Sequence, residues 1–253
     1  MECKNCQTPL EGQYCYNCGQ KKISERFSLK KILRDLFQTI VNLEKGFWYT
    51  MKELFLRPDQ VIKAYLGGAT IKYYNPFRYY LIIIAVVALL NVSLGIYDLQ
   101  QSDLRETLSP DVPEHIRQTQ IAISEYAKKF LNFIPLIILP FIAKMFHWIF
   151  KKRSWNYAEH LISTTYLYGQ VSIISILVLP CLYFAPQYIG WAFPISILIP
   201  ALFFSYAYRR IFEISTIKAF FLGFLAILGG ILMMTLTIMI LTFVVIITIK
   251  IVG

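Results

Sequence analysis

The spacing of hydrophobic residues along the chain changes near residue 79. Before it, apolar residues recur at steps of three and four, which is typical of amphipathic helices. The clearest stripe runs from Leu29 to Leu43, and shorter helical stretches follow over 47–55 and from Pro58 to Leu66. We expect region 23–78 to form amphipathic helices that lie at a membrane interface, pack on the rest of the protein, or do both.

After residue 79, the apolar stretches are long enough to cross a bilayer, which takes about 20 residues in a helix. Lys144 is a tolerable exception, because its long side chain can reach the nearby interface. The expected spans are 79–97, 130–150, 161–183, 190–208 and 219–249. The predicted fold class is an all-α membrane protein with five transmembrane helices in region 79–253.

The last apolar stretch is longer than one crossing requires. Ala219 to Ile249 comprises 31 uncharged residues, which as a helix would measure about 46 Å. A kink at Gly229-Gly230, or a first part lying in the interface, would absorb the excess length. We interpret the stretch as one span.

Loops rich in lysine and arginine alternate along the chain with loops that are not. Region 1–78 has 13 of them, loop 151–159 has three, loop 185–189 has none and loop 209–218 has three. The 98–129 connection has four, against six acidic residues. Because short cytoplasmic loops are enriched in Lys and Arg, we expect a cytoplasmic N-terminus and an extracytoplasmic loop at 98–129. The sequence opens with no signal-peptide pattern, which agrees with this orientation.

The composition favours lipid over nucleic acid as the partner of the basic residues. The chain is 57% hydrophobic and 16% charged, with a formal net charge of +10. Much of the positive charge lies in region 1–78 or beside apolar stretches, so we expect anionic membrane lipids as partners and no nucleic acid. A cytoplasmic protein partner and an oligomer are both compatible with the sequence.

Four cysteines near the N-terminus form two C-x-x-C pairs, Cys3 with Cys6 and Cys15 with Cys18. A two-residue gap lets both sulfurs of a turn face one ion, and four thiolates complete a tetrahedral zinc shell. Disulfides are the alternative, which a reducing cytoplasm disfavours. The sequence therefore predicts a structural zinc ribbon over 1–22. Cys181, inside a span, is expected to serve packing.

Polar residues gather at the predicted cytoplasmic ends of the spans. Ionisable groups near membrane depth are costly, so they are candidates for function. The candidate cluster consists of Tyr74, Arg78, His147, Glu159, His160, Arg209, Arg210 and Glu213. The simplest interpretation is that these residues anchor helices at the interface. The alternatives are a headgroup or anion site with Arg209 and Arg210 as ligands, and catalysis.

Further polar residues lie inside the predicted spans. They are candidates for a polar path, although such residues more often join helix to helix. They are Asn91, Tyr166, Tyr168, Gln170, Ser172 and Ser175. The sequence contains no nucleotide-binding, hydrolase or zinc-protease motif, so no enzyme is identified and a non-enzymatic role is favoured.

Several ordered segments together resemble a family of bacterial integral membrane proteins, the domain of unknown function 3667. Besides the two cysteine pairs, the segments are Arg57-Pro58, 64–68, 73–80, 156–161 and 206–212. The resemblance implies a zinc ribbon followed by a helical domain in a bacterial cytoplasmic membrane, and it implies no activity. Members typically carry a histidine-containing segment after the Glu-His pair, whereas this chain has 163–170 without histidine there.

The sequence therefore predicts one of two functions. The first is a membrane-anchored interaction or regulatory protein that uses its zinc ribbon and basic amphipathic helices. The alternative is a transporter or lipid-handling protein, which would need a polar cavity that reaches Arg209, Arg210 or His160. The favoured cofactor is structural zinc.

Overall fold

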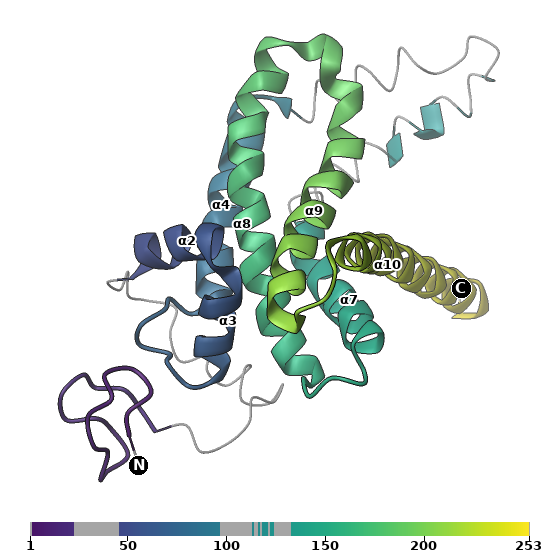
Figure 1. The fold of residues 1–253 in the computed structure, drawn as a ribbon. Helices are drawn as coiled ribbons and strands as arrows, with labels where there is room; N and C mark the ends of the chain where they lie inside the picture. Colours follow the sequence, from purple (N-terminus) through teal and green to yellow (C-terminus); the bar gives the residue numbers. More distant parts are fainter. Residues whose placement is uncertain are drawn as a thin grey trace.

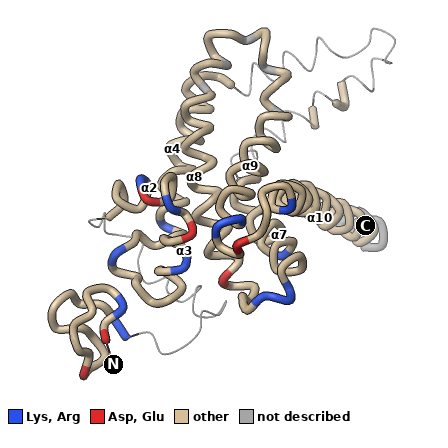
Figure 2. The backbone as a smooth tube through the Cα atoms, viewed as in Figure 1, with Lys and Arg blue, Asp and Glu red and all other residues tan. Residues whose placement is uncertain are grey.

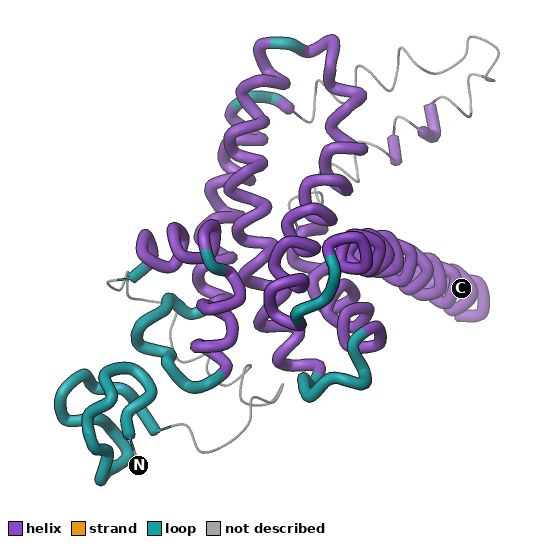
Figure 3. The backbone as a smooth tube through the Cα atoms, viewed as in Figure 1, coloured by secondary structure: helices purple, strands orange, loops and turns teal. Residues whose placement is uncertain are grey.

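The computed structural model describes residues 2–22, 46–96, 113, 116, 118–120, 122–123 and 133–252. Within these ranges the regular structure is helical and contains no strand (Figure 3). The main helices, in chain order, are α2 (Phe47–Leu56), α3 (Pro58–Leu66), α4 (Pro76–Ser93), α7 (Ile134–Ile149), α8 (Tyr157–Phe184), η2 (Pro186–Trp191), α9 (Ala192–Phe212) and α10 (Thr216–Val252) (Figure 1). The amphipathic helix predicted over 29–43 and most of the 98–129 loop lie outside the described residues.

Four of these helices are long and apolar enough to cross a membrane: α4, α8, α9 and α10. They correspond to the predicted spans 79–97, 161–183, 190–208 and 219–249. The span predicted over 130–150 corresponds to α7, which has 16 residues. At about 24 Å it is shorter than the hydrocarbon layer. The all-α membrane architecture is therefore supported, and the second of the five spans is not confirmed.

Two helices that follow polar loops begin at specific capping residues. The Asn75 side chain accepts hydrogen bonds from the backbone N–H groups of Phe77 and Arg78, and Pro76 occupies the first turn of α4. At the start of α8, Asn156 and Glu159 form a reciprocal capping box. Both caps satisfy N–H groups that an α-helix leaves without an internal partner, so they fix where each apolar helix begins.

Helices α2 and α3 form a short α2–α3 layer against the lower part of α4, α8 and α9 (Figure 1). Leu54, Val61 and Ile62 of this layer are fully buried. The side chain of Gln170 in α8 ties the layer to the long helices. Its Nε2 donates to the carbonyl of Met51 at 2.8 Å, and its Oε1 accepts from the hydroxyl of Tyr79.

An aromatic stack joins α7 to α9 in the centre of the helices. The ring of Phe146 lies parallel to Tyr208 with centroids 4.0 Å apart, and to Phe204 with centroids 5.4 Å apart. All three side chains are buried. Burial of large aromatic side chains is a major contribution to packing, so this stack holds the short α7 in place.

Helix α10 packs against α7 and α9 and runs at a steep angle to α8 and α9. In Figure 1, α8 and α9 lie in the plane of the picture, whereas α10 is seen nearly along its axis. It is one continuous helix of 37 residues, so Gly229-Gly230 does not interrupt it. Instead, a Cβ atom on Gly230 would lie 2.6 Å from Cγ1 of Ile142 in α7, and one on Gly223 would lie 2.4 Å from Oγ of Ser205 in α9. The glycines therefore allow α10 to approach both helices closely.

Charged residues occupy one end of the described molecule. The blue and red segments of Figure 2 lie around α2, α3 and the loops that join α7 to α8 and α9 to α10. The opposite end, formed by the α8–η2–α9 hairpin, contains none, because no Asp, Glu, Lys or Arg occurs between His160 and Tyr208. This separation is expected of a helical hairpin that crosses the hydrocarbon and keeps its charged end on one side of it.

Replacing Gly230 by leucine should weaken the packing of α10 on α7. The added side chain would collide with Ile142, including its backbone atoms at 3.1 Å, and overpacking of this kind costs about 1–3 kcal/mol. We expect a lower melting temperature for Gly230→Leu in detergent. Gly190→Leu is the control, since a Cβ atom there meets nothing within 4 Å. Equal melting temperatures for the two variants would contradict this packing.

Candidate metal centre and polar clusters

The ribbon, residues 2–22, consists of two knuckles with the same geometry, Cys3–Gln7 and Cys15–Gly19. In each, the N–H of the last residue donates to the carbonyl of the first cysteine, at 2.9 and 2.8 Å. In each, the N–H of the first cysteine donates to a carbonyl five residues later, at 2.9 and 2.8 Å. The repeated hydrogen bonds give both cysteine pairs the same local turn.

Each knuckle ends on a residue in the left-handed conformation. The φ angle is 61° at Gln7 and 70° at Gly19. Glycine adopts this region without steric cost, whereas a residue with a Cβ atom does so rarely. Gly19 therefore suits the left-handed conformation that the turn requires. The first knuckle has Gln7, a less suitable residue, at the equivalent position.

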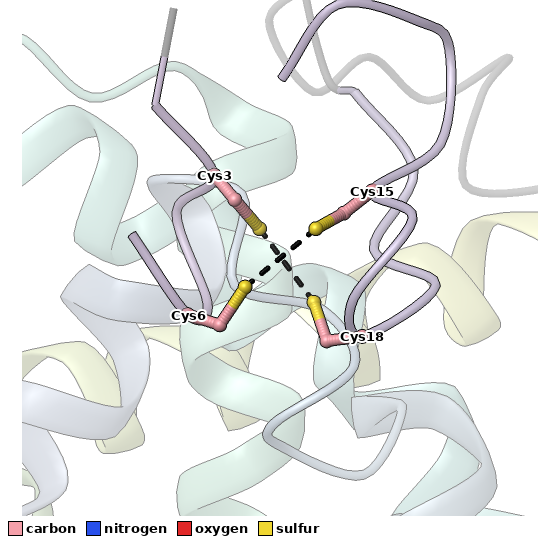
Figure 4. A group of neighbouring side chains, drawn as sticks. All are labelled: Cys3, Cys6, Cys15 and Cys18. Carbon is pink, nitrogen blue, oxygen red and sulfur yellow. Dashed lines mark hydrogen bonds between the residues drawn. The ribbon is translucent and has the colours of Figure 1, made fainter. Parts of the chain in front are cut away.

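The four thiol groups point toward a common centre (Figure 4). The Sγ atoms of Cys3 and Cys18 are 3.6 Å apart, as are those of Cys6 and Cys15, and all four lie within 4.8 Å of one another. Sulfur ligands about 2.3 Å from a zinc ion would be about 3.8 Å apart in a tetrahedron. No disulfide joins the cysteines, all five of which are described. The donor set and its spacing are compatible with a closed zinc site.

The hydroxyl of Thr8 contacts Cys6, one of the four candidate metal ligands. Its Oγ1 lies 3.1 Å from the sulfur of Cys6 and accepts a hydrogen bond from Asn17 at 3.2 Å. Hydrogen bonds from the Thr8 hydroxyl and the Thr8 backbone N–H lower the pKa of the Cys6 thiol to about 6. Because the thiolate is the form that binds metal, Thr8 favours the ligand state at neutral pH. Sequence reasoning overlooked Thr8 and Asn17.

Gln20 attaches the ribbon to the rest of the protein. Its side chain is 2% exposed and contacts the turn between α3 and α4. Nε2 donates to the carbonyl of Gly68 at 2.5 Å and to Thr70 Oγ1 at 3.1 Å, while Oε1 accepts from the N–H of Ile71 at 3.0 Å. One amide therefore makes three hydrogen bonds across the junction. Apart from its position directly after the second knuckle, nothing in the pattern of residues indicates this role of Gln20.

The outward face of α2 combines apolar and cationic side chains. Trp48 is 73% and Leu56 53% exposed, and Lys52 is exposed on the same helix. The helix lies across α4 and α8 (Figure 1). Nearby, the Lys72 ammonium lies 6.0 and 5.4 Å from the ring centroids of Tyr49 and Tyr73. This is the arrangement that an in-plane interfacial helix requires.

The predicted polar cluster does not form a single site, and Arg210 shows why. Its Nε lies 2.9 Å from Oδ1 of Asp59, and its NH1 group donates to the carbonyl of Leu56 at 2.9 Å and to the hydroxyl of Tyr206 at 2.6 Å. Arg210 thus clamps α9 to the α2–α3 layer. Arg210, which was expected to bind an anion, therefore has a structural role. Its ion-pair partner Asp59 was not predicted.

Other members of the cluster also have local structural roles. Glu159 Oε2 accepts from the N–H of Asn156 at 2.6 Å, as part of the α8 cap. The backbone N–H of Tyr74 donates to Thr50 at 2.8 Å, and its carbonyl accepts from Tyr166 at 2.5 Å. Arg78 is half-buried in the first turn of α4. These positions agree with the anchoring interpretation.

Arg209 and Glu213 are exposed at the end of α9. With Arg210, Tyr206 and Ile214 they line an open hollow of about 510 Å³. Of the two arginines predicted to bind an anion, Arg209 is the one that does not take part in the Asp59 clamp.

The two remaining members, His147 and His160, come together between α7 and α8. Their ring centroids are 5.9 Å apart. His160 is fully buried, and its Nδ1 lies 3.1 Å from the hydroxyl of Tyr208 in α9. The sequence analysis placed both histidines in one cluster, and it did not include Tyr208, the partner of His160.

The residues considered for a polar path separate into two groups. Asn91, Tyr168, Ser172 and Ser175 line a largely apolar cavity of about 270 Å³ between α4, α8 and α9. Tyr166 and Gln170 instead hydrogen-bond to the segment around α2 and α4, as described above. The lining of this cavity does not include Arg209, Arg210 or His160.

Comparison with known proteins adds one finding. The model of a family described as Protein of unknown function (DUF3667) matches residues 44–87. We call residues 44–87 the DUF3667 segment, because they are similar to this family. The match confirms the family resemblance seen in the sequence for Arg57-Pro58, 64–68 and 73–80, which lie within it. No curated protein and no solved structure matches the chain.

The DUF3667 segment coincides with a structural unit. It contains the α2–α3 layer, the turn that binds Gln20, the Asn75 cap and most of α4. It therefore includes Asp59, the partner of Arg210, and Tyr79, the partner of Gln170. The match covers the surface on which the ribbon and the long helices meet, whereas the ribbon itself lies outside the matched residues.

Purified protein should contain one zinc ion per chain, held by the four ribbon cysteines. Cys6→Ser should lose most of this zinc, because three thiolates leave the tetrahedral shell open. Zinc should also be released as the pH falls, because protons compete with the metal for the thiolates. Elemental analysis of protein at stepped pH values measures both effects. Cys181→Ser is the control, and a zinc content that is the same in all three proteins and at every pH would contradict the site.

Proposed function

We propose that the protein is a multi-pass protein of a bacterial cytoplasmic membrane that presents a zinc-bound ribbon as a binding module for a cytoplasmic protein partner. Two exposed tyrosines on the ribbon are the observation that carries the proposal. Tyr14 is 60% and Tyr16 82% exposed, beside the buried Cys15. Tyrosine is enriched at protein interfaces because it offers a large, rigid surface with a polar end.

The attachment of the ribbon supports a presenting role. Gln20 binds the turn between α3 and α4, so the ribbon rests on the α2–α3 layer. The thiols of the metal centre are directed inward, and a four-cysteine site leaves zinc without an open position for substrate. What the ribbon offers to other molecules is therefore its outer surface.

The α2–α3 layer would hold the ribbon at the membrane surface. Trp48, Phe55 and Leu56 are exposed on α2 next to Lys52. Such a face suits the boundary between acyl chains and anionic headgroups, where aromatic rings and lysines each find a favourable environment. The excess of Lys and Arg at this end of the molecule favours the cytoplasmic side.

Replacing both ribbon tyrosines should abolish binding of the protein partner without loss of the bound zinc. For Tyr14→Ser with Tyr16→Ser, we expect at least a tenfold lower recovery of proteins cross-linked to the ribbon in cells, since interface tyrosines are often dominant contacts. Zinc content and melting temperature should be unchanged. Tyr188→Ser is the matched control, because Tyr188 is 57% exposed at the far hairpin. Unchanged cross-linked proteins in the double variant would contradict the proposal.

A headgroup site is the second candidate function, and the hollow beside Arg209 favours it. The hollow is open, and its lining includes Tyr206 and Arg209, the arginine that does not take part in the Asp59 clamp. An arginine at the interface suits a lipid phosphate, which it can bind through two parallel hydrogen bonds. The Asp59 clamp leaves Arg209 as the ligand on which such a site would depend.

Arg209→Gln should lower the retention of anionic lipid if this site exists. Native mass spectrometry of protein extracted from vesicles that contain phosphatidylglycerol measures the lipid-bound fraction. We expect a several-fold decrease for Arg209→Gln and little change for Lys218→Gln, an exposed cation in the first turn of α10. An equal decrease in both variants would indicate a nonspecific effect of charge and would exclude the site.

A further inference from the structure

Four buried polar atoms near the junction of α7, α8 and α9 have no hydrogen-bond partner among the described residues. They are Nδ1 of His147, Nε2 of His160, Oγ of Ser163 and Oγ1 of Thr164. The last three belong to side chains that are 0% exposed. His160, Ser163 and Thr164 share one face of α8, because residues three and four apart lie above one another on a helix.

The two hydroxyl groups differ from others on the same helix. Thr165 donates to the carbonyl of Leu161 at 2.7 Å, and Ser172 donates to that of Tyr168 at 2.9 Å. Such bonds to the preceding turn are the usual way in which a serine or threonine satisfies its hydroxyl in an apolar environment. Ser163 and Thr164 make no bond of this kind. Neither hydroxyl is therefore satisfied by its own helix.

The surroundings of these atoms are the hydroxyl of Tyr208 and an aromatic wall. The hydroxyl of Tyr208 lies 3.1 Å from Nδ1 of His160, and the hydroxyls of Ser163 and Thr164 lie close to it without hydrogen-bond geometry. Rings of the aromatic wall approach His160 with centroid distances of 5.5 to 6.4 Å, from Trp155, Phe212 and Phe150. These rings exclude bulk water but cannot satisfy the four polar atoms.

The chemistry of the donor set defines the ligand. Two imidazoles and two hydroxyls include neither a thiolate nor a carboxylate, so they fall short of the three or four strong ligands that zinc sites use. None of the four atoms is hydrogen-bonded to a charged residue in the described part of the chain. A small neutral molecule that both donates and accepts hydrogen bonds fits, and water needs only two to four such partners.

We propose that His147, His160, Ser163 and Thr164 form a buried site for small neutral hydrogen-bonding molecules, occupied by water in the purified protein. Water there would bond to α7 through His147 and to α8 through its hydroxyls, and His160 already contacts Tyr208 of α9. The site would thereby link α7, α8 and α9. It is independent of the zinc ribbon.

The sign of a stability change decides between an occupied and a dry site. In an occupied site, Thr164→Val breaks a hydrogen bond to the ligand, so the melting temperature should fall by about 2–4 °C. In a dry site, the same isosteric change removes an unsatisfied hydroxyl and should raise the melting temperature. Thr165→Val is the matched control, because its hydroxyl bonds to its own helix, and we expect a smaller change. An increase for Thr164→Val would overturn the proposal.

Two further measurements identify the occupant. A structure of the full-length protein at a resolution that shows ordered water should have density within hydrogen-bond distance of Thr164 Oγ1, and a resolved but dry pocket would contradict the proposal. Elemental analysis of Cys6→Ser should find no metal that depends on His160. If the Cys6→Ser protein holds one equivalent of metal and the double variant with His160→Gln holds none, the occupant is a metal ion and the proposal is wrong.

Discussion

The absence of charge between His160 and Tyr208 is the constraint on which the rest of the structure depends. It covers nearly all of the α8–η2–α9 hairpin, so one end of the molecule has no group that prefers water strongly. Hydrocarbon is the solvent in which such a hairpin is stable. The charged residues are consequently confined to the other end (Figure 2), where the α2–α3 layer, the arginine clamp and the ribbon lie.

The same constraint explains how polar groups inside the helices are used. Away from water, each must find a partner in the protein or in a bound molecule. Gln170 joins α8 to α2 and α4, and serine and threonine hydroxyls bond to their own helices. Polar atoms of His160, Ser163 and Thr164 have no hydrogen-bond partner among the described residues, and for that reason we propose a site there.

Local features were predictable from the sequence, and features that depend on distant residues were not. The cysteine spacing predicted four converging thiols, and the apolar stretches predicted four of the long helices. The direction of α10 could not be predicted, because a helix that is apolar on all sides has no face to orient it. The members of the predicted polar cluster turned out to have separate local roles for a similar reason. Glu159 caps its own helix and Arg210 pairs with Asp59, and residue type at a helix end does not distinguish such roles from ligand binding.

The most direct measurement is the accessibility of two introduced cysteines, Lys152→Cys and Gln187→Cys, each placed in Cys181→Ser protein. Labelling is counted above that of the Cys181→Ser protein itself, which keeps the four ribbon cysteines. Lys152 lies in the loop between α7 and α8, and Gln187 lies at the tip of the hairpin. If α8 crosses the membrane, an impermeant maleimide added outside intact cells should not reach position 152, which should react only after the cells are lysed. Position 187 should react from outside. Labelling of both positions from the same side would contradict a hairpin with hydrocarbon as its solvent.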